Sequence, residues 1–265
     1  MHDEARFGGV ARLYGDAAVE RLAMAHAAVV GVGGVGSWTV EALARSGVGS
    51  LTLIDLDEVC VSNTNRQSHT LASTVGRLKV EVLKDRIQAI QPACHVTVHE
   101  DFFTAKTADR LLESPYDVVV DAIDQPRNKA LLIAGCLQRG QHVVCVGAAG
   151  GRRDPTALRI SDLAKSQSDA LLRQVRKILR REHGFPPASQ GPWGVTSVYS
   201  TETPVFPDGT GDICQDPNTS GAPLRMGCAT GYGAACHVTG SFGFAAAGAA
   251  IDGMIHRQSS GESAH

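Results

Sequence analysis

The sequence has seven cysteines but no pair with the Cys-x-x-Cys spacing that is typical of structural zinc sites. Their number is odd, and they are spread widely along the 265 residues. A disulfide framework would favour an even set with regular spacings. The sequence therefore predicts neither a structural zinc site nor a disulfide scaffold. The cysteines are Cys60, Cys94, Cys136, Cys145, Cys214, Cys228 and Cys236.

The sequence also lacks a recognisable secretion signal. The stretch MHDEARFGGVARLYGD mixes acidic and basic side chains where a signal peptide has a continuous apolar core, so a cytoplasmic location is expected. The most apolar late stretch, 238–255, is interrupted by Gly and Ser and contains Asp252. This pattern is typical of a small-residue core helix, and no membrane insertion is expected.

There is no excess of charge of one sign. The 25 basic and 27 acidic residues give a net charge of -2, whereas a dedicated nucleic-acid-binding protein is often basic. Overall charge therefore gives no support for nucleic-acid binding. With 43% hydrophobic residues, the chain can bury a large core, and its function has to be inferred from local motifs.

Apolar runs alternate with helical patterns through the first 150 residues. Four runs read as buried strands, at 27–34, 50–57, 116–124 and 142–150. Two segments between them, 37–47 and 128–140, have helical spacing. Strands that alternate with helices and are apolar on both faces are typical of a parallel sheet covered on both sides. We therefore expect an α/β fold over residues 1–150, a Rossmann-like doubly wound sheet with helices on both faces.

The pattern changes after Gly151. The second half of 162–184 has helical spacing, and 185–223 is dense in Pro, Gly, Ser and Thr, with a strand candidate at 195–201. A helix rich in glycine and alanine closes the chain. We expect residues 151–265 to form a loop-rich C-terminal part, with a basic helix and the closing helix, packed on the same domain.

A glycine-rich turn, VVGVGGVGSW, lies between the first strand and the first helix. Gly31, Gly33 and Gly36 have the G-x-G-x-x-G spacing, with Gly34 inside it. These glycines permit a tight turn, a close approach of backbone to phosphate, and close packing of helix on strand. Asp55, 24 residues after Gly31, suits a carboxylate that accepts hydrogen bonds from ribose. The turn is predicted to bind a nicotinamide dinucleotide or ATP; a turn that serves packing only is the alternative.

The segment after the second strand, IDLDEVCVSNTNRQ, bears on this choice. It contains Asp57, Asn63, Arg66 and Gln67, and Lys79 follows it. Hydride transfer needs few cations, whereas attack at the α-phosphate of ATP builds negative charge that Arg and Lys stabilise. Arg66 and Lys79 are therefore candidate catalytic residues of an ATP-dependent enzyme. The other three are candidate nucleotide ligands.

One further acidic residue is placed to hold a metal ion. Mg²⁺ prefers one or two carboxylates together with phosphate oxygens and water. Asp124 follows the run VVVDA, at the carboxyl end of the expected sheet, where such folds bind their ligands. It is the candidate Mg²⁺ ligand and the third candidate catalytic residue. Asp121 in the same segment is interpreted as a strand-end or helix-cap residue.

Taken in order, GVGGVG, IDLDEVCVSNTNRQ, VGRLKVEVLKDRI and VVDAID resemble the adenylation domain of the ubiquitin-activating-enzyme superfamily, the ThiF/MoeB/HesA group. The resemblance covers residues 6 to about 150. It implies that ATP and Mg²⁺ activate a carboxylate as an acyl-adenylate. It assigns Asp55 to the ribose, Asn63, Arg66 and Lys79 to the phosphates and Asp124 to the metal.

The resemblance also implies a homodimer in which an N-terminal arginine reaches the nucleotide site of the neighbouring subunit. The corresponding segment here is RFGGVARLYG. The usual pattern has a second arginine three residues after the first, and this chain has Gly9 there. Arg6 and Arg12 are therefore both candidates, with Arg6 included among the nucleotide-binding residues.

Other segments narrow the resemblance and extend it along nearly the whole chain. RFGG-x-ARLYG, NTNRQ, the region around the basic helix and RMGCATGYGAACHVTGSFGF resemble the tRNA threonylcarbamoyladenosine dehydratases. That implies ATP-dependent cyclisation of threonylcarbamoyladenosine beside the anticodon of certain tRNAs. Relatives are also associated with a cysteine desulfurase and its acceptor protein. Because cyclisation requires no thiol, Cys228 is interpreted as structural, and His69 and His237 are given no role.

Two other functions stay open. An activator of a ubiquitin-like sulfur-carrier protein would share the whole nucleotide site, but such proteins often have paired Cys-x-x-Cys zinc ligands, which this chain lacks. A nicotinamide-dependent oxidoreductase would leave Arg66, Lys79 and Asp124 unexplained.

Local charge offers independent support for RNA. Five cations fall along one face of the expected helix, opposite an apolar stripe of Leu172, Val175 and Leu179. Such a face can contact successive phosphates, although a solvated helix face is the alternative. We interpret Arg152 and Arg153 as an extension of this basic surface. The five candidate RNA-binding residues are Arg173, Arg176, Lys177, Arg180 and Arg181.

Overall fold

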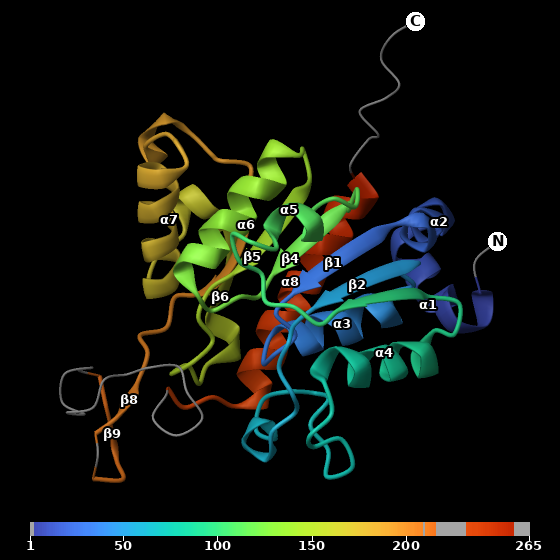
Figure 1. The fold of residues 1–265 in the computed structure, drawn as a ribbon, viewed down its shortest axis with the longest axis horizontal. Helices are drawn as coiled ribbons and strands as arrows, with labels where there is room; N and C mark the ends of the chain where they lie inside the picture. Colours follow the sequence, from blue (N-terminus) through green and yellow to red (C-terminus); the bar gives the residue numbers. More distant parts are fainter. Residues whose placement is uncertain (1–2, 209, 216–231, 257–265) are drawn as a thin grey trace, which may run out of the picture.

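Seven strands form one sheet in the computed structural model of the chain (Figure 1), which describes residues 3–208, 210–215 and 232–256. The strand order is β3-β2-β1-β4-β5-β7-β6. Neighbouring strands are parallel except β6 and β7, which are antiparallel. The strands are β1 (His26–Val30), β2 (Ser50–Ile54), β3 (His95–His99), β4 (Val118–Asp121), β5 (His142–Val146), β6 (Leu158–Asp162) and β7 (Thr196–Ser200).

The central strands are buried on both faces, which explains their continuous apolar sequences. In β1, Val29 lies beside Leu53 of β2 and Val120 of β4, and all three side chains are fully buried. Strands β2 and β3 lie to one side of β1, while β4 and β5 lie to the other. The order of the strands therefore reverses at the β1–β4 pair, and in such sheets ligands bind at the carboxyl end of this point.

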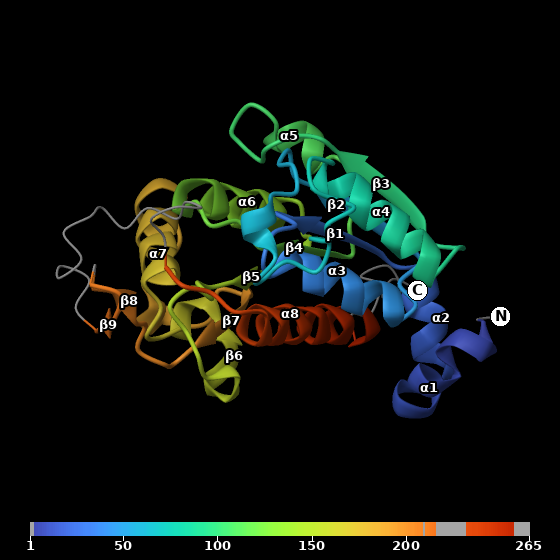
Figure 2. The same ribbon diagram turned by 90° about the horizontal axis from the view of Figure 1, so that it is seen from below.

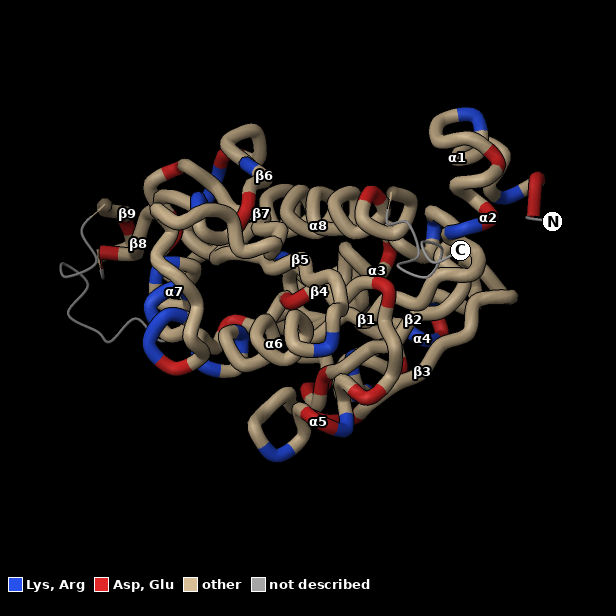
Figure 3. The backbone as a smooth tube through the Cα atoms, turned by 90° about the horizontal axis from the view of Figure 1, so that it is seen from above, with Lys and Arg blue, Asp and Glu red and all other residues tan. Residues whose placement is uncertain are grey.

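Helices cover both faces of the sheet. On one face are α3 (Gly36–Arg45), α4 (Lys79–Ile90) and α8 (Cys236–His256). On the other are α5 (Ala108–Leu111), α6 (Pro126–Gln138) and α7 (Ala170–Glu182). Figure 3 shows α3 and α8 on one side of the strands, with α5 and α6 on the opposite side.

The remaining elements lie at the two ends of the molecule. Helices α1 (Glu4–Tyr14) and α2 (Asp16–Met24) extend at one end, and a two-stranded ribbon of β8 (Phe206–Pro207) and β9 (Ile213–Cys214) lies at the other (Figure 2). Short 3-10 helices occupy Val61–Asn63, Pro155–Ala157, Leu163–Lys165 and Ala188–Gln190.

Helix α8 is long and apolar enough to cross a membrane by length and composition, yet 67% of its most apolar window is buried inside the protein. Phe242, Ala246 and Ala250 along it are fully buried in the core. At Gly243 an added Cβ would lie 2.6 Å from the Cβ of Trp38 in α3. The small residues therefore allow α8 to pack closely on α3, and the expected core helix is confirmed.

The structure confirms the predicted α/β fold and the basic and closing helices. The strand candidate at 195–201 contains β7, but the sequence patterns did not predict β3 or β6. Both are edge strands whose residues are only half-buried or exposed, so neither has the continuous apolar run of the central strands. Through β7 and β6 the C-terminal part joins the same sheet as β5.

Candidate nucleotide-binding site

The predicted nucleotide ligands lie on loops at the carboxyl ends of β1, β2 and β4. Gly31 directly follows β1, Asp55 directly follows β2, and Asp124 lies three residues beyond the end of β4. These strands are neighbours in the sheet. The fold therefore brings to one edge residues that are up to 93 positions apart between Gly31 and Asp124.

The glycine turn packs more tightly than any side chain would permit. A Cβ at residue 36 would lie 1.9 Å from the carbonyl oxygen of Gly31. Gly31 itself has a φ of +83°, and a Cβ there would lie 3.0 Å from the carbonyl oxygen of Ala122, in the loop after β4. No described side chain caps the N-terminus of α3 at Val35. The turn thus presents a helix N-terminus, a favourable site for phosphate.

Asp55 ties this turn to the loop after β2. Its Oδ2 accepts a hydrogen bond from the Val32 N–H at 2.8 Å, and its Oδ1 accepts one from the Asp57 N–H at 2.9 Å. Burial raises the pKa of the Asp55 carboxyl, an effect that the nearby Lys79 cation opposes. A carboxylate offers about four lone-pair sites, so its oxygens can still accept hydrogen bonds from a ribose.

Lys79 begins α4 and points its ammonium group to this loop. Its Nζ lies 2.7 Å from Oδ2 of Asp57, and its backbone N–H donates to the Asp57 carbonyl at 3.0 Å. The Lys79 side chain is only 6% exposed, whereas that of Asp57 is 51% exposed. A buried ammonium beside an exposed carboxylate can exchange that partner for a phosphate oxygen.

Hydrogen bonds between side chains and backbone groups hold the segment 63–67 in place. Buried Asn63 accepts from the Cys60 N–H through Oδ1 at 3.0 Å. The Arg66 carbonyl accepts from the Trp38 indole at 3.1 Å and from Oγ1 of Thr239 at 3.0 Å. The glycine turn lies against it, because a Cβ at residue 34 would meet Cγ of Arg66 at 3.6 Å. Arg66 is therefore next to the expected phosphate position.

Four consecutive residues beside the turn carry buried polar atoms that have no hydrogen-bond partner within the described chain. A Cβ at Gly33 would contact Nε2 of Gln67 at 3.7 Å, which places this set against the turn. Buried polar groups are normally satisfied, so these four atoms are exceptions beside the turn. The atoms are Oε1 of Gln67, Oγ of Ser68, Nδ1 of His69 and Oγ1 of Thr70.

His69 is a residue of this site to which the sequence patterns assigned no role. Its Nε2 lies 3.0 Å from the Val32 carbonyl, on the glycine turn, so Nε2 carries the proton. Burial lowers the pKa of His69 to about 4. The ring is thus neutral, and its Nδ1 is an acceptor within the set just described. A single histidine after NTNRQ carries no spacing signal that could have predicted this position.

Asp124 sits on a loop that a buried ion pair fixes. Lys129 Nζ lies 3.0 Å from Oδ1 of Asp121, and it donates to the carbonyls of Asp121 at 2.9 Å and Ile123 at 3.1 Å. Burial raises the pKa of Asp121 to about 6, against the effect of Lys129. Asp121 is a strand-end residue with a structural role. Asp124, in contrast, is exposed.

The described residues contain no group of three or more His, Cys, Asp or Glu side chains that could enclose a metal ion. Mg²⁺ does not require one, because it is commonly held by one or two carboxylates and by phosphate oxygens of a bound nucleotide. The exposed carboxylate of Asp124, on the loop whose residues 122 and 123 meet Gly31, fits this donor set.

Arg6 is not brought to the glycine turn of its own chain. It lies on α1, is exposed, and pairs with Asp3. Helix α2 leads into the first residue of β1, so α1 and α2 precede the amino end of that strand, whereas the glycine turn follows its carboxyl end. Arg12, on the same helix, is also exposed.

The basic face of α7 agrees with the prediction at every cation except Arg176. Leu172, Val175 and Leu179 are buried as predicted. Arg176 is half-buried, with Nη1 donating to the Ser166 carbonyl at 2.7 Å. The other four candidate cations are exposed, and Figure 3 shows the basic segments on this helix.

The interpretation of Arg152 as part of an exposed basic surface is wrong, because its side chain folds inward and the residue is 4% exposed. Arg153 is exposed. Cys228 lies outside the described residues.

The chain is similar to one family of known proteins, both in sequence and in structure. Residues 9–182 match the ThiF family. The tRNA threonylcarbamoyladenosine dehydratase of Escherichia coli (strain K12) is 48% identical over 94% of this chain and 93% of that protein. The Haemophilus influenzae protein of the same name is 43% identical over 97% of this chain and 95% of that protein. The crystal structure of the E. coli enzyme, TcdA, in complex with ATP has a TM-score of 0.83 and 44% identity, covering 95% of this chain and 94% of that one.

The neutral state of His69 predicts acid sensitivity. Because the pKa of His69 lies near 4 in the folded protein and the usual histidine value is 6.5, the unfolded chain takes up the proton first as the pH falls. The contribution of neutral His69 to the free energy of unfolding is therefore present above pH 6.5 and is lost between pH 6.5 and 4. We expect it to lower the free energy of unfolding by about 2 kcal/mol between pH 7.5 and 5.

The measurement is urea denaturation of the wild-type protein and of His69→Gln at both pH values. The variant should lose less stability than the wild type over this range. An equal loss in the two proteins would contradict the role given to His69.

Proposed function

The chain belongs to the ThiF family, and on that premise we propose that it is an ATP-dependent tRNA threonylcarbamoyladenosine dehydratase. The observation that supports this most strongly is that the similarity to proteins of that name runs along nearly the whole chain. An activator of a sulfur-carrier protein would share the nucleotide site but would not require likeness in the C-terminal part. That alternative is not favoured.

The reaction requires two displacements. First, a carboxylate oxygen of the threonyl group attacks the α-phosphorus of ATP, the bond to diphosphate breaks, and an acyl-adenylate forms. Next, the carbamoyl group of the same nucleoside attacks the acyl carbon, and AMP leaves with one carboxylate oxygen. The carbamoyl group loses a proton as the ring closes, so the nucleoside loses one water in total. Because both reacting groups belong to one nucleoside, the second step gains from proximity.

Each candidate residue has a place in the first step. The glycine turn Gly31–Gly36 and the N-terminus of α3 receive the phosphates, and Asp55 accepts hydrogen bonds from the ribose. Arg66 and Lys79 stabilise the charge that builds at the α-phosphate. Asp57 pairs with Lys79 until the nucleotide binds. Buried Asn63 and Gln67 are the remaining polar residues proposed to line the nucleotide site.

Mg²⁺ is the metal that the donor set at Asp124 fits best. When bound there, it would neutralise charge on the phosphate oxygens of ATP and on the departing diphosphate. Asp121 and Lys129 act indirectly, because they fix the loop from which Asp124 projects.

The remaining assignments concern partners. The protein is proposed to act in the cytoplasm as a homodimer, in which Arg6 or Arg12 reaches the partner subunit's nucleotide site; both arginines are exposed and lie away from their own site. A cysteine desulfurase or sulfur-acceptor protein is a further proposed partner. We assign residues 1–150 to the adenylation core and residues 151–265 to the part that meets the RNA. Strands β6 and β7 of the second part belong to the same sheet as the core.

The exposed cations of α7 are proposed to contact the tRNA backbone near the modified nucleotide. Their side chains lie on the solvent side of a helix whose other side is packed in the core. Arg176 supports this surface by its hydrogen bond to Ser166 and is the exception among the five.

Replacing the exposed carboxylate at the metal site should affect chemistry and not stability. We expect Asp124→Asn to lower the rate of AMP release in the presence of modified tRNA on the order of 100-fold or more, since metal-held charge is worth several kcal/mol in the transition state. The matched control is Asp109→Asn, whose carboxylate is 98% exposed on α5 and pairs with Arg139, a residue that has no place in the candidate site. An unchanged rate in Asp124→Asn would exclude Asp124 as the metal ligand.

The basic face of α7 predicts salt-dependent RNA binding. In the double variant Lys177→Gln/Arg180→Gln, tRNA affinity should fall and the slope of log affinity against log salt should decrease by about 1 to 2. ATP affinity should not change. The control Arg21→Gln/Lys106→Gln removes two exposed cations outside residues 151–265. Equal effects of both double variants would show that α7 has no particular role.

A further inference from the structure

The Arg66 side chain is held at both ends, although the residue is only half-buried. Its stem lies against the glycine turn, because a Cβ at residue 34 would meet its Cγ at 3.6 Å and its Cδ at 3.7 Å. Its Nη1 donates to the Ser62 carbonyl at 2.8 Å and to Oδ1 of Asn65 at 3.0 Å. Both bonds use Nη1, and within the described residues Nε and Nη2 bind no acceptor. The guanidinium is thus fixed at one nitrogen and open to a phosphate at the others.

The side-chain amide of Asn65 joins Arg66 to a distant segment of the chain. While its Oδ1 accepts from Arg66, its Nδ2 donates to the Ala234 carbonyl at 2.7 Å, 169 positions along the chain. A guanidinium can only donate and a carbonyl can only accept, so the two partners fix which end of the amide faces each of them. Asn65 is exposed. Its orientation therefore comes from these two hydrogen bonds and not from burial.

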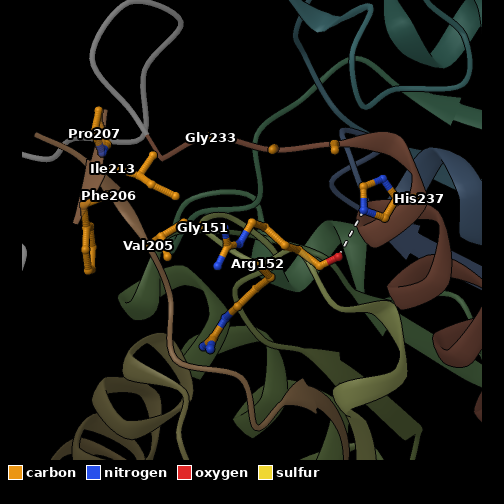
Figure 4. Close-up of a pocket in the computed structure, with 11 residues that line it drawn as sticks. Gly151, Arg152, Val205, Phe206, Pro207, Ile213, Gly233 and His237 are labelled. Carbon is orange, nitrogen blue, oxygen red and sulfur yellow. Dashed lines mark hydrogen bonds between the residues drawn. The ribbon is translucent and has the colours of Figure 1, made fainter. Parts of the chain in front are cut away.

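The segment that carries Ala234 is itself anchored to the loop after β5. The Gly233 carbonyl accepts from the Gly151 N–H at 2.7 Å, and Nε2 of His237 donates to the Arg153 carbonyl at 3.1 Å. Figure 4 shows Gly233 and His237 on this segment, along a cavity of about 390 Å³ that Gly151 also lines. The Ala234 carbonyl is therefore presented to Asn65 from a segment that two hydrogen bonds hold in place.

The main chain of Arg66 is anchored to the same part of the protein. Its carbonyl accepts from Oγ1 of Thr239 in α8 at 3.0 Å, in addition to the Trp38 indole at 3.1 Å. The C-terminal part thus acts on Arg66 twice, directly at the carbonyl and through Asn65 at the guanidinium. The first contact fixes where the side chain begins, and the second fixes where its charged end lies.

We propose that Asn65 is a positioning residue, which holds the Arg66 guanidinium in the orientation that stabilises the α-phosphate of ATP, with the Ala234 carbonyl as its anchor. This inference rests on the proposed function. Fixing an arginine side chain costs conformational entropy. A donor that is already oriented when the nucleotide binds does not lose that entropy during the reaction. Asn65 acts through Arg66 and needs no contact with the nucleotide.

The test is a double-mutant cycle of Asn65→Ala and Arg66→Ala in the full-length protein, measured as kcat for AMP release with modified tRNA and as Kd for ATP. We expect Asn65→Ala to lower kcat on the order of 10-fold to 100-fold, the effect of a misplaced catalytic group. ATP binding should weaken by about 3-fold to 10-fold. In the Arg66→Ala background the same change should have no further effect on either quantity, because Asn65 acts through that side chain.

The matched control is Thr64→Val, in the same turn, where Oγ1 donates to the Val61 carbonyl at 2.6 Å and not to Arg66. Its kcat should equal that of the wild type, and the Tm of Asn65→Ala should be unchanged because the residue is exposed. An unchanged kcat in Asn65→Ala, an equal loss in Thr64→Val, or an equal loss with and without Arg66 overturns the inference.

The cycle in Kd for ATP needs no reaction, so it separates failure of this inference from failure of the proposed function. Wild-type protein that binds ATP and the modified RNA but never dehydrates the nucleoside overturns the proposed function. Additive effects of the two substitutions on the Kd for ATP overturn the role of Asn65 whatever the substrate is.

Discussion

The site depends on one close approach, between the backbone of residue 36 and the carbonyl oxygen of Gly31. A Cβ at residue 36 would lie 1.9 Å from that oxygen, so only glycine lets α3 begin directly against the end of β1. This contact directs the N-terminus of α3 over the carboxyl edge of the sheet. The Val32 N–H that Asp55 binds and the Val32 carbonyl that His69 contacts both belong to the same turn.

Buried carboxylates hold the loops at this edge by binding backbone N–H groups. Asp55 fixes the glycine turn, Asp121 binds the Ile123 N–H at 3.1 Å, and Asp169 binds the Ala148 N–H just beyond β5. Asp169 also explains why residue 147 is glycine, since a Cβ there would lie 2.4 Å from its Oδ2. These acids bind backbone, whereas the carboxylate of Asp124, the proposed metal ligand, is exposed.

Local sequence was sufficient for features that depend on local spacing. The glycine turn, Asp55 and the amphipathic α7 lie where their patterns predict. Features set by distant contacts were not predictable. Arg152 lies in GGRRDP, which is typical of an exposed loop, yet Ser168 and Glu202, far along the chain, help to enclose it. The unpaired Nδ1 of His69 likewise depends on the glycine turn more than 30 residues earlier.

The reaction proposed for this protein consumes ATP to remove one water from a nucleoside in tRNA. The most direct measurement is mass spectrometry of nucleosides from tRNA that carries threonylcarbamoyladenosine, after incubation with the purified protein, ATP and Mg²⁺ under conditions mild enough to preserve a cyclic product. The account predicts that the modified nucleoside loses the mass of one water only when ATP is present. An unchanged nucleoside, from a protein shown to bind ATP and the tRNA, would contradict it.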